Sequence, residues 1–213
     1  EHVESPEFGS PARDNSSFNV RVRGSTGLCY EELRLAVPGA HQHINAALAV
    51  AICHHIDQSG WRLMADHVRD GLRTAGVPAR VEVVSETPLV VVDVAHNEAS
   101  MHELVTCLGE MTDRRKAAEG HCSRRRLLFS CSGDKNIEAM LRCAANYFDE
   151  IVLTRFLLNP RAAKLQDLRQ VANRYFAADN VTLHESPEAA WNATWRATLE
   201  DDEIGRASCR ERV

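Results

Sequence analysis

The sequence lacks the features that mark membrane, fibrous and secreted proteins. It has only 11 glycines and 7 prolines in 213 residues, too few for a collagen-like or low-complexity chain. No apolar run approaches the about 18 residues that a membrane helix needs. The N-terminal stretch EHVESPEF carries acidic residues where a secretory signal is basic and apolar. We therefore expect a cytoplasmic protein of one or two globular domains with no membrane partner.

Charge and cysteine content do not favour nucleic-acid or zinc binding. The net charge is −5 and the basic residues are dispersed, which argues against a protein that binds duplex nucleic acid. The exception, Arg124–Arg126, ends a segment of mixed charge, 113–126, which we interpret as an exposed loop. A phosphate or nucleic-acid patch is the less favoured alternative there. The 7 cysteines include no C-x-x-C pair, so reduced thiols are expected.

The two ends of the chain are unusual. The sequence opens without Met in a polar, turn-rich stretch, which favours a fragment that begins partway through a larger protein. Residues 203–213, EIGRASCRERV, resemble the conceptual translation of a sequencing adapter and have no apolar period. We therefore expect the natural sequence to stop near Asp202 and the last eleven residues to be a non-native tail.

Two strands and two helices are expected in the first part of the chain. Residues 18–23 alternate apolar and polar side chains, and 28–37 form a second extended segment. Apolar residues at helical spacing predict helices over 41–56 and 61–75, and 76–78 follow as a hinge. The expected apolar faces comprise Ile44, Leu48, Ala51 and His55 in the first helix, and Trp61, Met64, Val68, Leu72 and Ala75 in the second.

After the hinge, strands and helices alternate. The expected strands are 80–84, 89–94, 127–130, 151–154 and 181–183, and the expected helices lie around 99–108, 137–144, 163–176 and 191–199. Strands separated by helical segments imply right-handed crossovers. The fold class is therefore α/β, a mostly parallel sheet with helices on both faces.

Three polar clusters follow expected strands, at the sheet edge where such folds bind ligands. The first is Asp93–Asn97, which can hold a ribose, a phosphate or a metal-bound water; the alternative is that Asn97 merely caps the next helix. The second is Ser132–Lys135, whose lysine a helix cap leaves unexplained. The third includes Arg161, which can grip a carboxylate or phosphate, although a solvent-facing arginine is the simpler interpretation.

Other catalytic motifs are missing from the sequence. The pairs His41/His43 and His54/His55 do not have the i, i+4 spacing of a zinc helix, so a metal site there is not favoured. The chain has no G-x-x-x-x-G-K-[ST] phosphate loop, no G-x-S-x-G elbow and no dinucleotide-binding glycine motif.

Taken together, the clusters resemble the C-terminal half of the folylpolyglutamate synthase / dihydrofolate synthase family, within the Mur ligase superfamily. Four stretches carry the resemblance: PGAHQHINAALAVA (38–51), PARVEVV (78–84) with PLVVVDVAHN (88–97), SCSGDKNIEAML (130–141) and LTRFLLNPRAA (153–163). The resemblance implies that 1–77 end a P-loop-type ATPase domain. Residues 78–202 would then be the Mur ligase C-terminal domain, a Rossmann-like fold.

The resemblance also implies roles for single residues. In the family the Asn of H-Q-x-x-N-A contacts adenine, which matches Asn45. The arginine of P-x-R-x-E and the Asp of D-x-A-H-N bind ATP, which matches Arg80 and Asp93. His96 would lie near the centre of acyl transfer as a catalytic residue. Two further cations would face glutamate or phosphate, Lys135 in a catalytic role and Arg161 in substrate binding.

The implied reaction is ATP-dependent addition of L-glutamate to a folate or dihydropteroate carboxylate through an acyl phosphate, with Mg²⁺. The phosphate loop and the Mg²⁺ ligands would lie upstream of this sequence, and the family's closing strand is missing after Asp202. We therefore expect no ligase activity from these 213 residues alone. The alternatives are another Mur-type amino-acid ligase and a noncatalytic nucleotide-binding module. Dihydrofolate synthase and folylpolyglutamate synthase are not distinguished.

Overall fold

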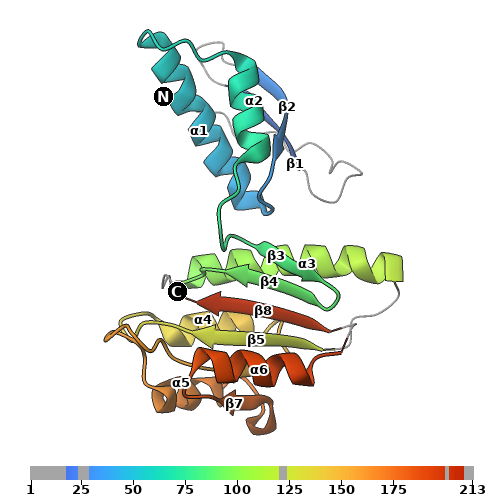
Figure 1. Ribbon diagram of the computed structural model, residues 1–213, viewed down its shortest axis with the longest axis vertical. Coiled ribbons are helices and arrows are strands. Elements are labelled where there is room, and N and C mark those ends of the chain that lie inside the picture. Colours follow the sequence, from blue (N-terminus) through green and yellow to red (C-terminus); the bar gives the residue numbers. More distant parts are fainter. Residues whose placement is uncertain (1–17, 24–28, 120–123, 200–201, 209–213) are drawn as a thin grey trace. The chain divides into compact units, whose positions relative to one another are not determined.

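The computed structural model describes residues 18–23, 29–119, 124–199 and 202–208 (Figure 1). The chain divides into two compact units, Glu1–Pro78 and Ala79–Val213, each described here by itself. No helix among the described residues is long and apolar enough to cross a membrane. Cys53, Cys107, Cys131 and Cys143 are free cysteines.

The first unit packs two helices against a two-stranded sheet. Strands β1 (Phe18–Arg23) and β2 (Cys29–Leu35) pair antiparallel. Helices α1 (Ala40–Gln58) and α2 (Ala65–Thr74) follow, close to the predicted ranges, except that α2 begins four residues after Trp61. The small core of this unit comprises Leu33, Leu35, Ala46, Ala47, Val50 and Val68.

The predicted apolar face of α1 is wrong. Ile44 and Leu48 are 63% and 60% exposed, whereas Ala46, Ala47 and Val50 are buried against β2 and α2. This helix carries apolar residues on all sides, so its periodicity alone does not select the buried face. The smaller side chains face the sheet, where a close approach of helix and strand favours them.

The second unit is built on one six-stranded sheet in the order β3-β4-β8-β5-β6-β7. All neighbouring pairs are parallel except β3 with β4. The strands are β3 (Glu82–Glu86), β4 (Leu89–Asp93), β5 (Arg125–Ser130), β6 (Glu150–Leu153), β7 (Val181–Leu183) and β8 (Glu203–Ser208). This arrangement confirms the predicted α/β class with a mostly parallel sheet.

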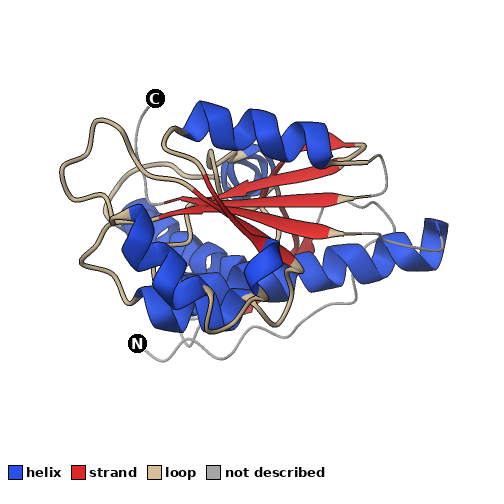
Figure 2. Ribbon diagram, turned by 90° about the horizontal axis from the view of Figure 1, so that it is seen from below, coloured by secondary structure: helices blue, strands red, loops and turns tan. Residues whose placement is uncertain are grey.

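Helices cover both faces of this sheet (Figure 2). They are α3 (Glu98–Glu119), α4 (Ile137–Ala144), α5 (Leu165–Ala172) and α6 (Pro187–Ala197), and a short 3₁₀ helix, η1 (Ala178–Asn180), precedes β7. Leu127 and Phe129 of β5 join the main core with α3, α4 and α5, whereas Leu128 packs with Val152 and with Ala190 of α6. This alternation places α6 alone on one face, because neighbouring strand residues point to opposite faces.

The prediction of a loop over 113–126 is wrong at both ends of this range. Helix α3 continues to Glu119, and β5 already begins at Arg125; the segment 120–123 lies outside the described residues. The segment TDRRKAAE that ends the helix has good helix formers but no apolar stripe. The segment therefore lacks the apolar periodicity of an amphipathic helix, although the helix propensity of its residues favours a helix.

The prediction that the closing strand is missing is also wrong. Residues 203–208 form β8, which lies in the middle of the sheet between β4 and β5. Ile204 and Ala207 are fully buried, and a Cβ on Gly205 would meet the Phe148 ring at 2.6 Å. A central parallel strand needs small or apolar residues and backbone hydrogen bonds, and the segment EIGRAS supplies both. Residues 209–213 of the predicted tail lie outside the described residues.

Candidate functional site

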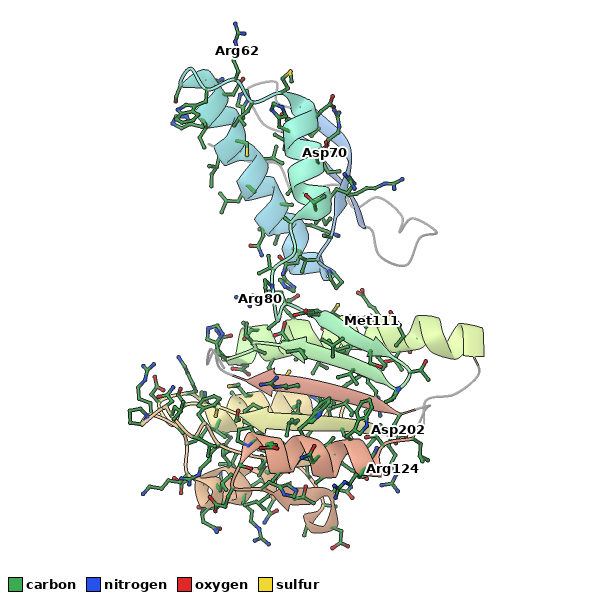
Figure 3. The ribbon with its side chains drawn as sticks, viewed as in Figure 1. Arg62, Asp70, Arg80, Met111, Arg124 and Asp202 are labelled. Carbon is green, nitrogen blue, oxygen red and sulfur yellow. The ribbon has the colours of Figure 1, made fainter. Side chains whose placement is uncertain are left out.

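The candidate residues of the second unit lie at one edge of its sheet, the edge formed by the carboxyl ends of β4, β8, β5, β6 and β7. These five strands run parallel, so the loops that follow them meet at this edge. Because β3 runs antiparallel to β4, the segment that leads into β3 meets the same edge: Glu82 pairs with Val92. We call this the carboxyl edge. The opposite end, with Asp202 and Arg124, is the amino edge (Figure 3).

Asp93, the last residue of β4, is buried at the carboxyl edge. Only 5% of its surface is exposed, and its Oδ2 accepts a hydrogen bond from the Val81 amide at 2.9 Å. The structure therefore brings Asp93 next to the Arg80 segment, as the predicted site requires. The contact is made through the backbone.

The backbone around Arg80 is strained. Ala79 and Val81 have φ values of 55° and 47°, in the left-handed region that residues with a side chain rarely adopt. Arg80 lies between them and is half-buried; among the described residues its guanidinium has no ion-pair or hydrogen-bond partner. A partly buried cation with all of its donors open is suited to bind an anion.

His96 is held in one orientation. Its backbone amide donates to the Ser100 hydroxyl at 3.0 Å, and its Nδ1 lies 3.1 Å from the Val94 carbonyl oxygen. A carbonyl oxygen only accepts, so Nδ1 carries the proton and Nε2 of the neutral ring keeps its lone pair. The alternative interpretation holds for Asn97: its Oδ1 accepts from the Ser100 amide at 2.8 Å and caps α3.

The second and third clusters are joined by the backbone. The Gly133 amide donates to the Arg161 carbonyl at 2.8 Å, and the Ala163 amide donates to the Cys131 carbonyl at 3.0 Å. These bonds fasten the loop after β5 to the loop after β6. Lys135 and Arg161 therefore lie on connected loops at the carboxyl edge.

Neither of these two cations is tightly paired. The Lys135 Nζ lies 3.9 Å from Asp134, at the limit of an ion pair, and Arg161 is exposed with no side-chain partner among the described residues. A buried hydroxyl, that of Thr154 after β6, likewise has no hydrogen-bond partner in the described part of the chain. Both loops thus carry polar groups that no described residue pairs closely.

Asn45 belongs to the first unit. It is exposed in the second turn of α1, and its Nδ2 donates to the Gln42 side chain at 2.9 Å. Its convergence with Arg80 and Asp93 on one nucleotide therefore stays a prediction. No three His, Cys, Asp or Glu side chains of the described residues gather to hold a metal ion, so we assign no residue here to Mg²⁺.

Sequence reasoning missed two residues of the site. Ser100 fixes the turn that carries His96, and Glu82 accepts a hydrogen bond from the Ala79 amide through its Oε2 at 2.7 Å. Glu82 was visible as the last letter of P-x-R-x-E, but nothing in the sequence shows that its carboxylate turns back three residues along the chain.

The fold and the edge define an α/β domain with cations at the carboxyl edge that have no close partner among the described residues. Residues 79–204 match the family model described as the Mur ligase, glutamate ligase domain. The chain belongs to this family.

The chain resembles dihydrofolate synthase/folylpolyglutamate synthases in sequence. It is 30% identical to the Bacillus subtilis protein over 177 residues, which cover 81% of this chain and 38% of the relative. It is 28% identical to the Mycobacterium tuberculosis protein, over 94% of this chain and 43% of the relative. These matches confirm the resemblance to this ligase family. The chain spans less than half the length of these curated relatives.

Solved structures agree with this likeness. A structure of Escherichia coli FolC in complex with DHPP and ADP superposes with a TM-score of 0.68 at 26% identity, covering 90% of this chain and 41% of that one. A bifunctional folylpolyglutamate synthase/dihydrofolate synthase with Mn, AMPPNP and L-glutamate bound gives a TM-score of 0.71 at 25% identity, covering 92% and 44%.

Proposed function

We propose that this chain is the glutamate-ligase part of an enzyme that adds L-glutamate to the carboxylate of a folate or dihydropteroate at the expense of ATP. The observation that carries the proposal is the gathering of Arg80, Asp93, His96, Lys135 and Arg161 at one edge of one sheet. All except Arg80 were expected at this edge, and the resemblance to the ligase family implies a ligand-binding or catalytic role for all five. The relatives named above include dihydrofolate synthase/folylpolyglutamate synthases.

The proposed reaction has two steps. The acceptor carboxylate attacks the γ-phosphate of ATP, so that ADP leaves and an acyl phosphate forms. The amine of L-glutamate then attacks the acyl carbon, phosphate leaves, and the amine loses a proton. Mg²⁺, held by residues outside this chain, would neutralise phosphoryl oxygens.

The residues of this chain divide this work by their chemistry. The open guanidinium of Arg80 binds nucleotide phosphate, Asp93 contributes to ATP binding, and Asn45 contacts the adenine. The Nε2 lone pair of His96 is free to accept a proton near the attacking amine, because Nδ1 is engaged with the Val94 carbonyl. Lys135 and Arg161 bind the carboxylates of the incoming glutamate or the departing phosphate.

The test uses a fusion protein, which we call the joined enzyme. The upstream part of the Bacillus subtilis relative is fused to this chain, and ATP-dependent addition of radiolabelled glutamate to dihydropteroate and to folates is measured. The unjoined chain should add no glutamate. In the joined enzyme Arg80→Ala should lower turnover by about 100-fold or more, as the loss of a fixed charge at a transition state does.

The matched control is Arg196→Ala. Arg196 is an exposed arginine in the last turn of α6, which packs on one face of the sheet, and its loss should leave turnover unchanged. A folded joined enzyme that binds ATP but transfers glutamate to neither acceptor would support the noncatalytic nucleotide-binding module. Transfer of a different amino acid would support another Mur-type ligase. Equal turnover with and without Arg80 would overturn its assignment.

A further inference from the structure

We propose that Glu82 and Asp93 are positioning residues that aim Arg80, by holding the backbone on both sides of it in the left-handed region. The inference deepens the proposed function, since Arg80 is the residue to which nucleotide binding is assigned there. It gives Glu82 a role that its motif alone does not suggest. It also assigns Asp93 an action that passes through Arg80.

The first observation is the strain itself. A positive φ brings the Cβ of an L-residue close to the carbonyl group of the preceding residue, and a β-branched residue such as Val81 adopts it only when other contacts compensate. Two such residues flank a single arginine. Strain of this kind persists where the surroundings over-determine the backbone, which is most often at a functional site.

The second observation is the set of hydrogen bonds that hold this segment. The Ala79 amide donates to Glu82 Oε2 at 2.7 Å, and the Val81 amide donates to Asp93 Oδ2 at 2.9 Å. The Ala79 carbonyl accepts from the Val94 amide at 3.0 Å. Carboxylate acceptors make stronger bonds than neutral ones. The two carboxylates therefore fasten the residue before and the residue after Arg80, and we call them the clamp.

The third observation is that the clamp leaves the side chain of Arg80 unpaired among the described residues. The side chain of Val81 is 3% exposed and packs in the main core, so the segment is anchored from below. The guanidinium of Arg80 has no hydrogen-bond or ion-pair partner among the described residues, so its position depends on the backbone that carries it. Fixing a long side chain before the ligand arrives lowers the entropy lost on binding. A clamp that served only to attach the start of the unit would have no need to leave an unpaired arginine between its two bonds.

The first arm of the test measures the backbone. Three-bond amide–Hα couplings and amide hydrogen exchange of Ala79 and Val81 are recorded by NMR on the full chain. Glu82→Ala should shift the Ala79 coupling and speed exchange of its amide, while Asp93→Asn should act on Val81. Glu82→Gln retains an oxygen acceptor and should restore most of the effect. The matched control is Glu86→Ala, an exposed glutamate at the other end of β3, which should change neither residue.

The second arm measures anion binding. Inorganic pyrophosphate and MgATP are titrated while the Nε–Hε resonance of Arg80 is followed. Glu82→Ala should weaken the apparent affinity about two- to tenfold, the value of ordering one long side chain. The double variant Glu82→Ala/Arg80→Ala should bind the anions no more weakly than Arg80→Ala alone, because the clamp acts only through Arg80.

The outcomes separate the clamp from the proposed function. If Ala79 and Val81 keep their couplings and exchange rates in both variants, the clamp is overturned. Equal losses of affinity with and without Arg80 would overturn its action through that residue. If the couplings change as expected while Arg80 in the parent chain responds to neither anion, the clamp stands and the assignment of Arg80 to nucleotide phosphate fails.

Discussion

The two edges of the sheet in the second unit use charge in opposite ways. At the amino edge the charges are paired and the central pair is buried: Arg126 is only 8% exposed in its side chain and bonds both Asp202 at 2.5 Å and Glu150 at 2.7 Å. At the carboxyl edge Arg80 and Arg161 have no side-chain partner among the described residues. The charged side chains of the amino edge pair with one another and hold strands together. The two arginines of the carboxyl edge remain available to a ligand.

A buried hydroxyl network extends the amino edge. The hydroxyls of Thr112 and Tyr147 both donate to Glu203 Oε2, at 2.8 and 2.7 Å. Burial, aided by the charge of Glu203, raises the pKa of Tyr147, so this phenol remains a donor throughout the physiological range. The network links α3 and the loop before β6 to the first residue of β8.

The largest loss of stability is expected from removing β8. A chain that ends at Asp202 should lose most of its stability, which for a domain of this size is about 5–15 kcal/mol, because β4 and β5 would lose their shared neighbour. Urea unfolding followed by circular dichroism measures the loss. A chain that ends at Ser208 is the control and should unfold like the parent. An unchanged midpoint for the shorter chain would show that β8 contributes little.

The next largest effect is expected from Asp202→Ala. This carboxylate pairs with Arg126 and also accepts from the amides of Arg124 and Leu199. Its removal leaves a buried guanidinium with one partner fewer and should cost about 3–5 kcal/mol of unfolding free energy. Asp202→Asn keeps the acceptors and should cost less. A loss below about 1 kcal/mol for Asp202→Ala would contradict the view that amino-edge charges hold the fold.

A smaller effect is expected from pH, through Asp149. Burial acts to raise the pKa of this carboxyl, but the hydrogen bonds from the side chain and backbone of Arg125, with its charge, hold the pKa below its ordinary value. Its contribution to stability is therefore present above the unfolded pKa of about 3.9 and is lost as the pH falls through the folded pKa. Urea midpoints between pH 6 and pH 3 should fall less steeply for Asp149→Asn than for the parent. Identical slopes would show that the pair stabilises nothing.

The smallest effect on stability should come from the carboxyl edge. Arg161 is exposed, and within the described part of the chain its hydrogen bonds are made by its backbone. Arg161→Ala should therefore change the free energy of unfolding by less than about 0.5 kcal/mol. The same variant should weaken the binding of pyrophosphate, measured by NMR titration of the chain. A stability loss comparable with that of Asp202→Ala would remove the distinction between the two edges.

Sequence patterns predicted the element order of this protein more successfully than its element ends and buried faces. Alternating apolar runs located most strands of the second unit to within a few residues. The same reasoning missed β8, because EIGRAS has neither a clear alternation nor an apolar run, and its burial comes from the two strands beside it. It also chose Ile44 and Leu48 as core, although neither is buried. Local patterns do not contain the neighbour that covers a face.

The position of the site was predictable for a topological reason. Asp93 ends a strand, and Ser132 and Thr154 follow strands, all of which proved to be parallel, so their shared edge could be inferred from chain order alone. The contacts between them could not. The bond from Gly133 to the Arg161 carbonyl joins two loops that are far apart in sequence, and no local signal records it.

By itself, the sequence determined the fold class, the family and the residue types available at the carboxyl edge, because periodicity and motif order are local properties of the chain. The tertiary structure decided which charged side chains are paired within the fold and which remain unpaired. Arg126 and Arg80 are alike as residues, and only the folded surroundings pair the first with Asp202 and leave the second unpaired between two clamped amides. Pairing depends on which groups the fold brings within hydrogen-bond distance, and that distance is set by packing across the whole sheet.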